Sequence, residues 1–268
     1  LGTDADVAYT IPSMGHRYGA FLGLAKRIRE ATGKPVFQAS RIPDLSTARW
    51  ALEQGFVDMV GMTRAHIADP HIVAKLQRGE EDRIRPCVGA GYCIDRIYVG
   101  GDALCVHNPA TGRERTMPHV IRPGAGPQRR VVVIGGGPAG LEAARVSAAR
   151  GHHVVLLEAT DRLGGQVNLA ARLDRRREIL GITGWLEREV ELAGVEVRLN
   201  SYADTDDVRG GGPLGPRAAQ ADRAAHPRQL DALAGKGSAV QLQTHHAMHG
   251  GTEVELDHLA AGQPVEVR

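Results

Sequence analysis

The sequence lacks the features that mark several classes of protein. It has no run of about 18 consecutive apolar residues, the length that a bilayer-spanning helix needs, and it does not open with a basic stretch followed by an apolar one. Its 33 Lys and Arg are nearly balanced by 31 Asp and Glu, so no basic excess is present to neutralise the phosphates of a nucleic acid. We therefore expect a cytoplasmic protein with no membrane segment and no nucleic-acid partner.

Cysteine is also scarce. Cys87, Cys93 and Cys105 are an odd number of thiols in a chain of 268 residues, which argues against a disulfide framework. All three lie in the weakly periodic segment 80–128, which ends in the linker-like sequence RPGAGP. Thiolates that converge from a glycine-rich loop suit an iron–sulfur cluster. A zinc site completed by His107, and three unligated thiols, are the alternatives that spacing alone leaves open.

Residues 1–79 alternate between helix and strand patterns. Helices are expected at 18–31, at 46–54, and from the Asp-Pro pair at 69–70 onward, where Asp caps a helix that Pro begins. Short apolar runs at 35–39 and 56–60 indicate buried strands. The alternation predicts an α/β fold.

Polar residues directly follow both expected strands. Ser40 and Arg41 follow the first, and Gly61, Thr63 and Arg64 follow the second. In a (β/α)8 barrel the loops after the last two strands often form a phosphate site, although arginines at strand ends can equally be plain surface residues. A barrel needs about 250 residues, so residues 1–79 would be its C-terminal part, and at least half of it would be absent.

The strongest pattern lies in residues 129–209. A strand at 131–134, a glycine-rich turn, a helix at 141–150 and a strand at 154–158 make a βαβ unit, which a further helix at 175–193 and a strand at 195–199 extend. Gly135, Gly137 and Gly140 supply the Gly-x-Gly-x-x-Gly spacing. In this motif the glycines make the tight turn, admit a pyrophosphate to the helix N-terminus, and let the helix pack on the sheet.

Two further features indicate which nucleotide cofactor the motif binds. Glu158 ends the second strand, where a carboxylate accepts hydrogen bonds from a ribose, and this favours FAD, ADP or NAD over NADP. Gly164 and Gly165 form a second pair of small residues, which favours FAD unless they belong to a plain loop.

The composition changes after about residue 209. Residues 210–268 contain no Ile, Phe, Trp or Tyr, so we expect an unstructured or irregular tail. We interpret it as sequence translated out of frame.

Three stretches, in this order, resemble a known family. They are MVGMTRAHIADP (59–70), IRPCVGAGYCIDRIYVGGDALCVHNPATGRE (84–114) and VVVIGGGPAGLEAARVSAARGHHVVLLEATDRLGGQ (131–166). They look like the multidomain flavoproteins of the trimethylamine dehydrogenase, histamine dehydrogenase and 2,4-dienoyl-CoA reductase family, and most like its N-methylproline demethylase-like members. The similarity extends over about residues 35–208.

The resemblance implies three parts. Residues 1–79 would be the C-terminal part of an FMN-binding TIM barrel, 80–128 an iron–sulfur connector, and 129–209 a partial Rossmann-like domain that holds FAD or ADP. It places the FMN phosphate at the five residues after the strands, Ser40, Arg41, Gly61, Thr63 and Arg64. It assigns the three Cys as ligands of a [4Fe–4S] cluster and the FAD or ADP site to Gly135, Gly137, Gly140, Glu158, Gly164 and Gly165. Ala90 stands where the family has a fourth cluster ligand, which puts a four-thiolate cluster in question.

By the same resemblance, the chain is a fragment of a flavin- and iron–sulfur-dependent oxidoreductase. The whole enzyme would move electrons between FMN, the cluster and FAD or NAD(P)H, and would oxidise an N-methylated amine or reduce an enoyl substrate. A homo-oligomer is a further expectation. The family's catalytic acid and substrate pocket lie upstream of Leu1, so this chain alone is expected to be inactive. The alternatives are a truncated, non-catalytic nucleotide-binding remnant and a stand-alone FAD reductase with a zinc-bound connector.

Overall fold

The computed structural model describes residues 10–203, so the interpretation of 210–268 falls outside the described residues. In chain order, the elements of the first half are α2 (Leu22–Thr32), β1 (Phe37–Gln38), α3 (Leu45–Glu53), β2 (Met59–Val60), α4 (Thr63–Ala68), α5 (Ile72–Gln77), η1 (Glu81–Arg83) and α6 (Tyr92–Tyr98). Those of the second half are β3 (Arg130–Ile134), α7 (Pro138–Ala149), β4 (His153–Leu157), α8 (Gln166–Ala170), η2 (Asp174–Ile179), α9 (Leu180–Leu192) and β5 (Glu196–Arg198).

The first half is a small α/β unit. Strands β1 and β2 pair in parallel, with Phe37 opposite Met59. Helix α3 is capped by Asp44, whose carboxylate accepts the N–H of Thr47 at 2.7 Å. The buried residues of its core come from α2, α3 and the adjoining loops: Leu22, Ala25, Ile42, Ala48, Ala51 and Val57.

One helix start differs from the expectation. Asp69 is the C-cap of α4 rather than the N-cap of α5, which begins at Ile72. The carboxylate of Asp69 accepts the N–H of His71 at 3.0 Å, two residues further on. A short polar side chain that bonds to nearby backbone in this way makes a turn between helices.

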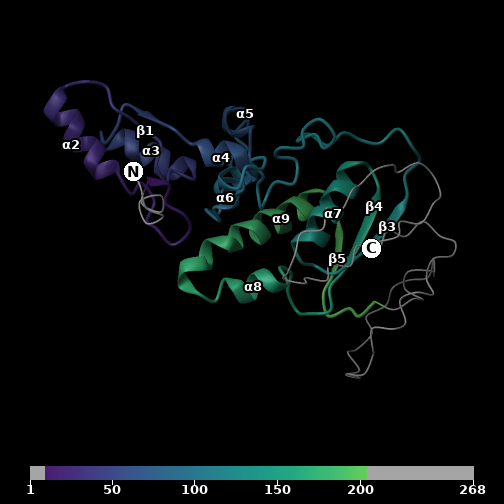
Figure 1. Ribbon diagram of the computed structural model, residues 1–268. Helices are drawn as coiled ribbons and strands as arrows, with labels where there is room; N and C mark the ends of the chain where they lie inside the picture. Colours follow the sequence, from purple (N-terminus) through teal and green to yellow (C-terminus); the bar gives the residue numbers. More distant parts are fainter. Residues whose placement is uncertain (1–9, 204–268) are drawn as a thin grey trace.

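The second half is a three-stranded parallel sheet in the order β3-β4-β5. All three strands were expected from the sequence. Helices α7 and α9 pack against each other and against the sheet (Figure 1). Leu141 of α7, Leu156 of β4 and Val190 of α9 are fully enclosed, and each contributes about 1.5–3 kcal/mol by leaving water.

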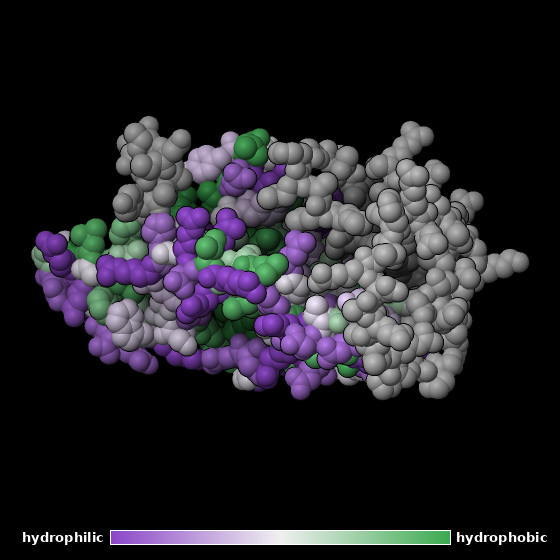
Figure 2. Space-filling model, turned by 90° about the horizontal axis from the view of Figure 1, so that it is seen from below, coloured by the Kyte–Doolittle hydropathy of each residue, from purple (hydrophilic) through white to green (hydrophobic). Residues whose placement is uncertain are grey.

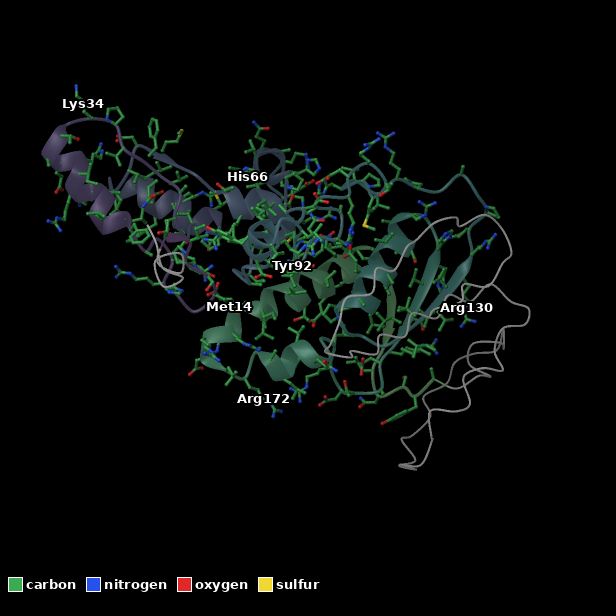
Figure 3. The ribbon with its side chains drawn as sticks, viewed as in Figure 1. Met14, Lys34, His66, Tyr92, Arg130 and Arg172 are labelled. Carbon is green, nitrogen blue, oxygen red and sulfur yellow. The ribbon has the colours of Figure 1, made fainter. Side chains whose placement is uncertain are left out.

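We call residues 80–128, which include η1 and α6 and lead to β3, the connector (Figure 1). Met14 packs against the core of the second half, and Val88 belongs to it; Figure 3 places Met14 beside α9. A Cβ at Gly181 of α9 would meet Val88 Cγ1 at 3.1 Å and Pro86 Cγ at 3.3 Å. The glycine therefore lets the connector approach α9 closely.

The surface seen from below is mostly hydrophilic, with a hydrophobic patch near the middle of the described part (Figure 2). Among residues 10–203, no helix combines the length and the apolar character needed to cross a membrane.

Candidate functional site

The glycine turn connects β3 to α7. Gly135 has φ +97°, in the left-handed region that glycine favours. A side chain at Gly140 would collide with the carbonyl oxygen of Gly135, so the helix contacts the turn directly. Gly137 is the N-cap of α7, and a Cβ added there would meet nothing within 4 Å. The space on the Cβ side of Gly137 is therefore free at the N-terminus of this 12-residue helix, the end at which an anion is favoured.

Glu158 lies beside this turn and is 8% exposed. One of its carboxylate oxygens accepts the N–H of Gly136 at 2.6 Å, and the other accepts the N–H of Thr160 at 2.8 Å. The hydroxyl of Thr160 lies 2.8 Å from the same Glu158 oxygen. A carboxylate offers about four acceptor positions, so Glu158 is held in place and keeps capacity for a further donor.

The second glycine pair completes the arrangement. Gly164 donates its N–H to the carbonyl oxygen of Gly136 at 2.8 Å. A Cβ at Gly165 would meet the Cα of Gly137 at 3.2 Å. The structure therefore brings the turn, Glu158 and the pair at 164–165 together. Gly136 and Thr160, which position Glu158, were not anticipated because no spacing rule singles them out.

The residues that follow β1 and β2, which are predicted to hold the FMN phosphate, each have different surroundings. Gly61 donates its N–H to the carbonyl oxygen of Gln38 at 2.8 Å, and a Cβ at Gly61 would meet Ala39 Cβ at 2.7 Å. The hydroxyl of Ser40 is buried without a hydrogen-bond partner. Thr63 is exposed and begins α4.

The two arginines of this group have different surroundings. Arg64 donates to the carbonyl oxygen of Pro12 at 2.8 Å. Arg41 is 2% exposed and is paired with Glu178 of η2 at 2.5 Å. A phosphate ligand role for Arg41 stays a prediction, and its guanidinium already has a carboxylate partner.

The three thiols lie around α6. Cys93 is buried on that helix, while Cys87 and Cys105 are half-buried. Burial raises the pKa of the Cys87 and Cys93 thiols, and the nearby charge of Arg64 only partly opposes this. Within residues 10–203, no three His, Cys, Asp or Glu side chains are grouped so that they could hold a metal ion. Other thiols also contribute to raising the pKa of Cys87 and Cys93. The iron–sulfur cluster, with Ala90 at one ligand position, stays a prediction.

His107 is enclosed by the second half. Its Nδ1 lies 3.0 Å from the carbonyl oxygen of Pro86, and its ring meets that of Trp185 edge-on at 5.3 Å. Burial, together with the charge of Arg85, lowers its pKa to about 4, so the ring is neutral at pH 7. Nε2 is buried without a hydrogen-bond partner.

Arg85 links the connector to the second half. Its guanidinium stacks over the Trp185 ring at 4.1 Å and donates to the carbonyl oxygen of His107 at 2.5 Å. It also lies 3.4 Å from the carboxylate of Glu142 on α7. No local sequence pattern indicates these contacts, because the partners are far apart along the chain.

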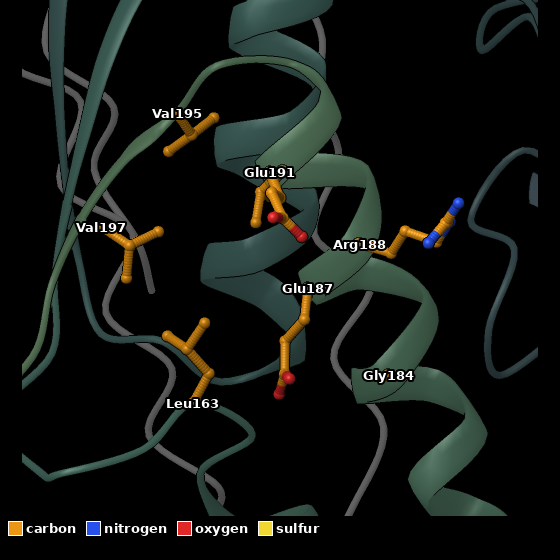
Figure 4. A pocket seen from close by; sticks show the side chains of 8 residues that line it. Leu163, Gly184, Glu187, Arg188, Glu191, Val195 and Val197 are labelled. Carbon is orange, nitrogen blue, oxygen red and sulfur yellow. The ribbon is translucent and has the colours of Figure 1, made fainter.

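A pocket of about 490 Å³ lies between α9 and β5 (Figure 4). Burial raises the pKa of Glu187, one of its residues. The pocket contains none of the predicted site residues; it is lined by Leu163, Gly184, Glu187, Arg188, Val190, Glu191, Val195 and Val197.

Comparison with known proteins bears on this site directly. The model of the family described as FAD dependent oxidoreductase matches residues 130–177, which include the glycine turn, Glu158 and the pair at 164–165. The described part of the chain is thus a mixed α/β structure in which residues 130–177 are similar to FAD-dependent oxidoreductases.

Curated relatives identify the wider family. The chain is 51% identical over 213 residues to a probable N-methylproline demethylase of Rhizobium meliloti (strain 1021), covering 80% of this chain and 31% of the relative. It is 52% identical over 203 residues to an N,N-dimethylglycine/sarcosine dehydrogenase of Chromohalobacter salexigens, covering 75% of this chain and 29% of the relative.

A solved structure shows a similarity to the same family. Histamine dehydrogenase from Rhizobium sp. 4-9 matches with a TM-score of 0.68 at 32% identity, over 74% of this chain and 29% of that chain. The similarity to the trimethylamine dehydrogenase, histamine dehydrogenase and 2,4-dienoyl-CoA reductase family is therefore confirmed. The chain spans slightly less than a third of the length of these relatives.

Proposed function

We propose that this chain carries the nucleotide-binding part of a flavin-dependent oxidoreductase, and that ADP or the ADP portion of FAD binds at the turn after β3. The observation that carries the proposal is the free space on the Cβ side of Gly137 at the N-terminus of α7, beside the fixed carboxylate of Glu158. The helix N-terminus would receive the pyrophosphate, and Glu158 would accept a ribose hydroxyl. Gly135 and Gly140 would shape the turn.

The proposed division of the chain follows from this. Residues 129–209 form a partial Rossmann-like domain, 80–128 a connector, and 1–79 the C-terminal part of an FMN-binding TIM barrel. The parallel pair of β1 and β2 supports the barrel assignment. The buried, unpartnered hydroxyl of Ser40 is consistent with a ligand there, and Gly61, Thr63 and Arg64 would hold the FMN phosphate beside it.

The substrate class comes from the relatives. Two of them are named for N-methylated amines, so we propose that the whole enzyme oxidises a small amine of this kind rather than reducing an enoyl compound. The two electrons would pass to the flavin, and the NAD(P)+/NAD(P)H couple would be the partner, with NAD(P)+ as the electron acceptor. Bound flavin would supply the redox chemistry, while this chain's residues bind and orient it. The iron–sulfur cluster stays a prediction from the resemblance, and we propose no electron transfer step through it.

The test is calorimetric titration of the purified chain with ADP. We expect binding of ADP and weaker binding of its 2′-phosphorylated analogue, since Glu158 repels a phosphate. Glu158→Gln should raise the Kd for ADP roughly tenfold, because a hydrogen bond to a charged group contributes about 1.5 kcal/mol or more. Glu53→Gln, in an exposed position on α3, is the matched control and should bind as the unmodified chain does.

Two results would contradict the proposal. One is the absence of ADP binding by a folded chain at millimolar concentration. The other is equal affinity of the unmodified chain and Glu158→Gln, which would remove Glu158 from the site.

A further inference from the structure

The guanidinium of Arg41 is enclosed by residues from separate parts of the chain. Its Nη2 donates to both carboxylate oxygens of Glu178, at 2.5 and 2.6 Å. Its Nε lies 3.4 Å from the carbonyl oxygen of His16, and its Cζ lies 5.0 Å from the centre of the Tyr18 ring. A side chain at Gly89 would collide with Nη1. Arg41 is thus enclosed on several sides, and its main hydrogen-bond partner is a carboxylate from the second half.

Glu178 contacts the first half through more than this one ion pair. The hydroxyl of Tyr18 donates to its second oxygen at 3.1 Å, and the N–H of Gly15 lies 3.4 Å from the first. Burial and the charge of Glu178 raise the pKa of Tyr18 to about 12, so this hydroxyl stays a donor at neutral pH. A Cβ at Gly15 would meet Arg175 Cβ at 3.2 Å. The segment around η2 is therefore fixed against the first half.

The same segment leads back to the nucleotide site. Glu178 belongs to η2, which follows α8, and α8 has Gly165 as its N-cap. Gly165 faces the Cα of Gly137 at the N-terminus of α7. Residues 164–179 therefore run from the glycine turn to the partner of Arg41, and α8 packs against η2 along the way.

We propose that Arg41 is a positioning residue for the nucleotide site, which it supports through Glu178 and the segment 164–179, and that it does not bind phosphate. This rests on the proposed function in that the site it supports is the ADP site. This pair suits the role, because the enclosed guanidinium contacts both carboxylate oxygens of Glu178 through Nη2 while its Nε lies near the His16 carbonyl oxygen, so the group is held in one orientation. Removing either partner would leave the other without its counter-charge.

The test compares Arg41→Met, Glu178→Gln and the double variant by ADP titration and by hydrogen–deuterium exchange of the ligand-free chain. Arg49→Met is the matched control, because Arg49 pairs with Glu81 within the first half and is exposed. Arg41→Lys keeps the charge but loses the Nε contact with His16 and the planar group over the Tyr18 ring. Tyr18→Phe removes one hydrogen bond to Glu178 and serves as the milder variant if a variant at Arg41 does not fold.

We expect each single variant to raise the Kd for ADP about three- to tenfold, the scale typical of coupling between neighbouring sites. The double variant should be no weaker than the worse single one, because both disrupt the same contact. Amides of 164–179 should exchange faster in the ligand-free variants, Arg41→Lys should not restore affinity, and Arg49→Met should change nothing.

The proposal is overturned if folded variants keep the ADP affinity of the unmodified chain, or if their losses simply add. It is also overturned if segment 164–179 exchanges at the unmodified rate. Failure of the unmodified chain to bind ADP would instead refute the proposed function, and the ligand-free exchange would still decide whether Arg41 fixes the segment.

Discussion

At the residue scale, the glycines of the turn are the most informative positions. Their spacing in the sequence predicted a tight turn and a close helix, and the geometry of Gly135 and Gly140 has both features. Glu158 was predicted as a ribose acceptor from its place at the end of a strand. The bonds that hold it, from Gly136 and Thr160, depend on how two loops meet in space, which no local pattern encodes.

Gly140→Ala should lower the free energy of unfolding by about 2 kcal/mol or more, because its methyl group would collide with the Gly135 carbonyl oxygen. Gly184→Ala is the control. A Cβ at Gly184, within α9, meets nothing within 4 Å, so alanine there should stabilise by about 0.5–1 kcal/mol. Urea unfolding measures both. Equal effects of the two substitutions would show that the close approach at Gly140 is not real.

At the scale of elements, apolar runs located the strands well, and in β4 the run is buried as expected of a parallel strand. The prediction that β1 and β2 are buried was wrong, because Phe37 and Met59 are exposed. The short helices α4 and α6 were not anticipated, since they are too brief to show a helical period. Asp69 also shows how little a short sequence pattern indicates about helix ends. Asp followed by Pro indicated a helix start, but the turn that Asp69 forms belongs to the end of the preceding helix.

The carboxylate of Asp69 accepts hydrogen bonds from Lys75, His71 and Arg85, and these bonds predict how the stability of the fold depends on pH. Burial would raise its pKa, but the Lys75 ammonium at 2.6 Å and the N–H groups of Arg85 and His71 outweigh burial and lower the pKa in the folded state. Below about pH 4 the unfolded state then binds more protons than the folded one. The stabilisation by Asp69 is therefore present above that pH and is lost as the pH falls through the lowered value.

Asp69→Asn should accordingly lower the free energy of unfolding by about 2 kcal/mol at pH 7, the scale of hydrogen bonds to a charged group. The difference from the unmodified chain should shrink as the pH falls below about 4. Chemical unfolding at a series of pH values measures this, with Asp95→Asn, at an exposed position on α6, as the control. A difference that grows towards low pH would have the wrong sign for this account.

At the scale of the whole molecule, the sequence indicated three consecutive parts but not how they pack. Some contacts between the halves join residues more than a hundred positions apart, as Arg41 with Glu178 and Arg83 with Glu189 do. Such pairs leave no periodic signal in a single sequence. For that reason the sequence predicts a phosphate-ligand role for Arg41 from its place after a strand but does not reveal its pairing with Glu178 of the other half.

The central claim is that this chain binds ADP at the turn after β3. The most direct measurement is hydrogen–deuterium exchange of the whole chain with and without ADP. The account predicts slower exchange of the amides at 135–141 and 158–168 when ADP is bound, with little change around β1 and β2. Unchanged exchange at the glycine turn under saturating ADP, or protection confined to the first half, would contradict it.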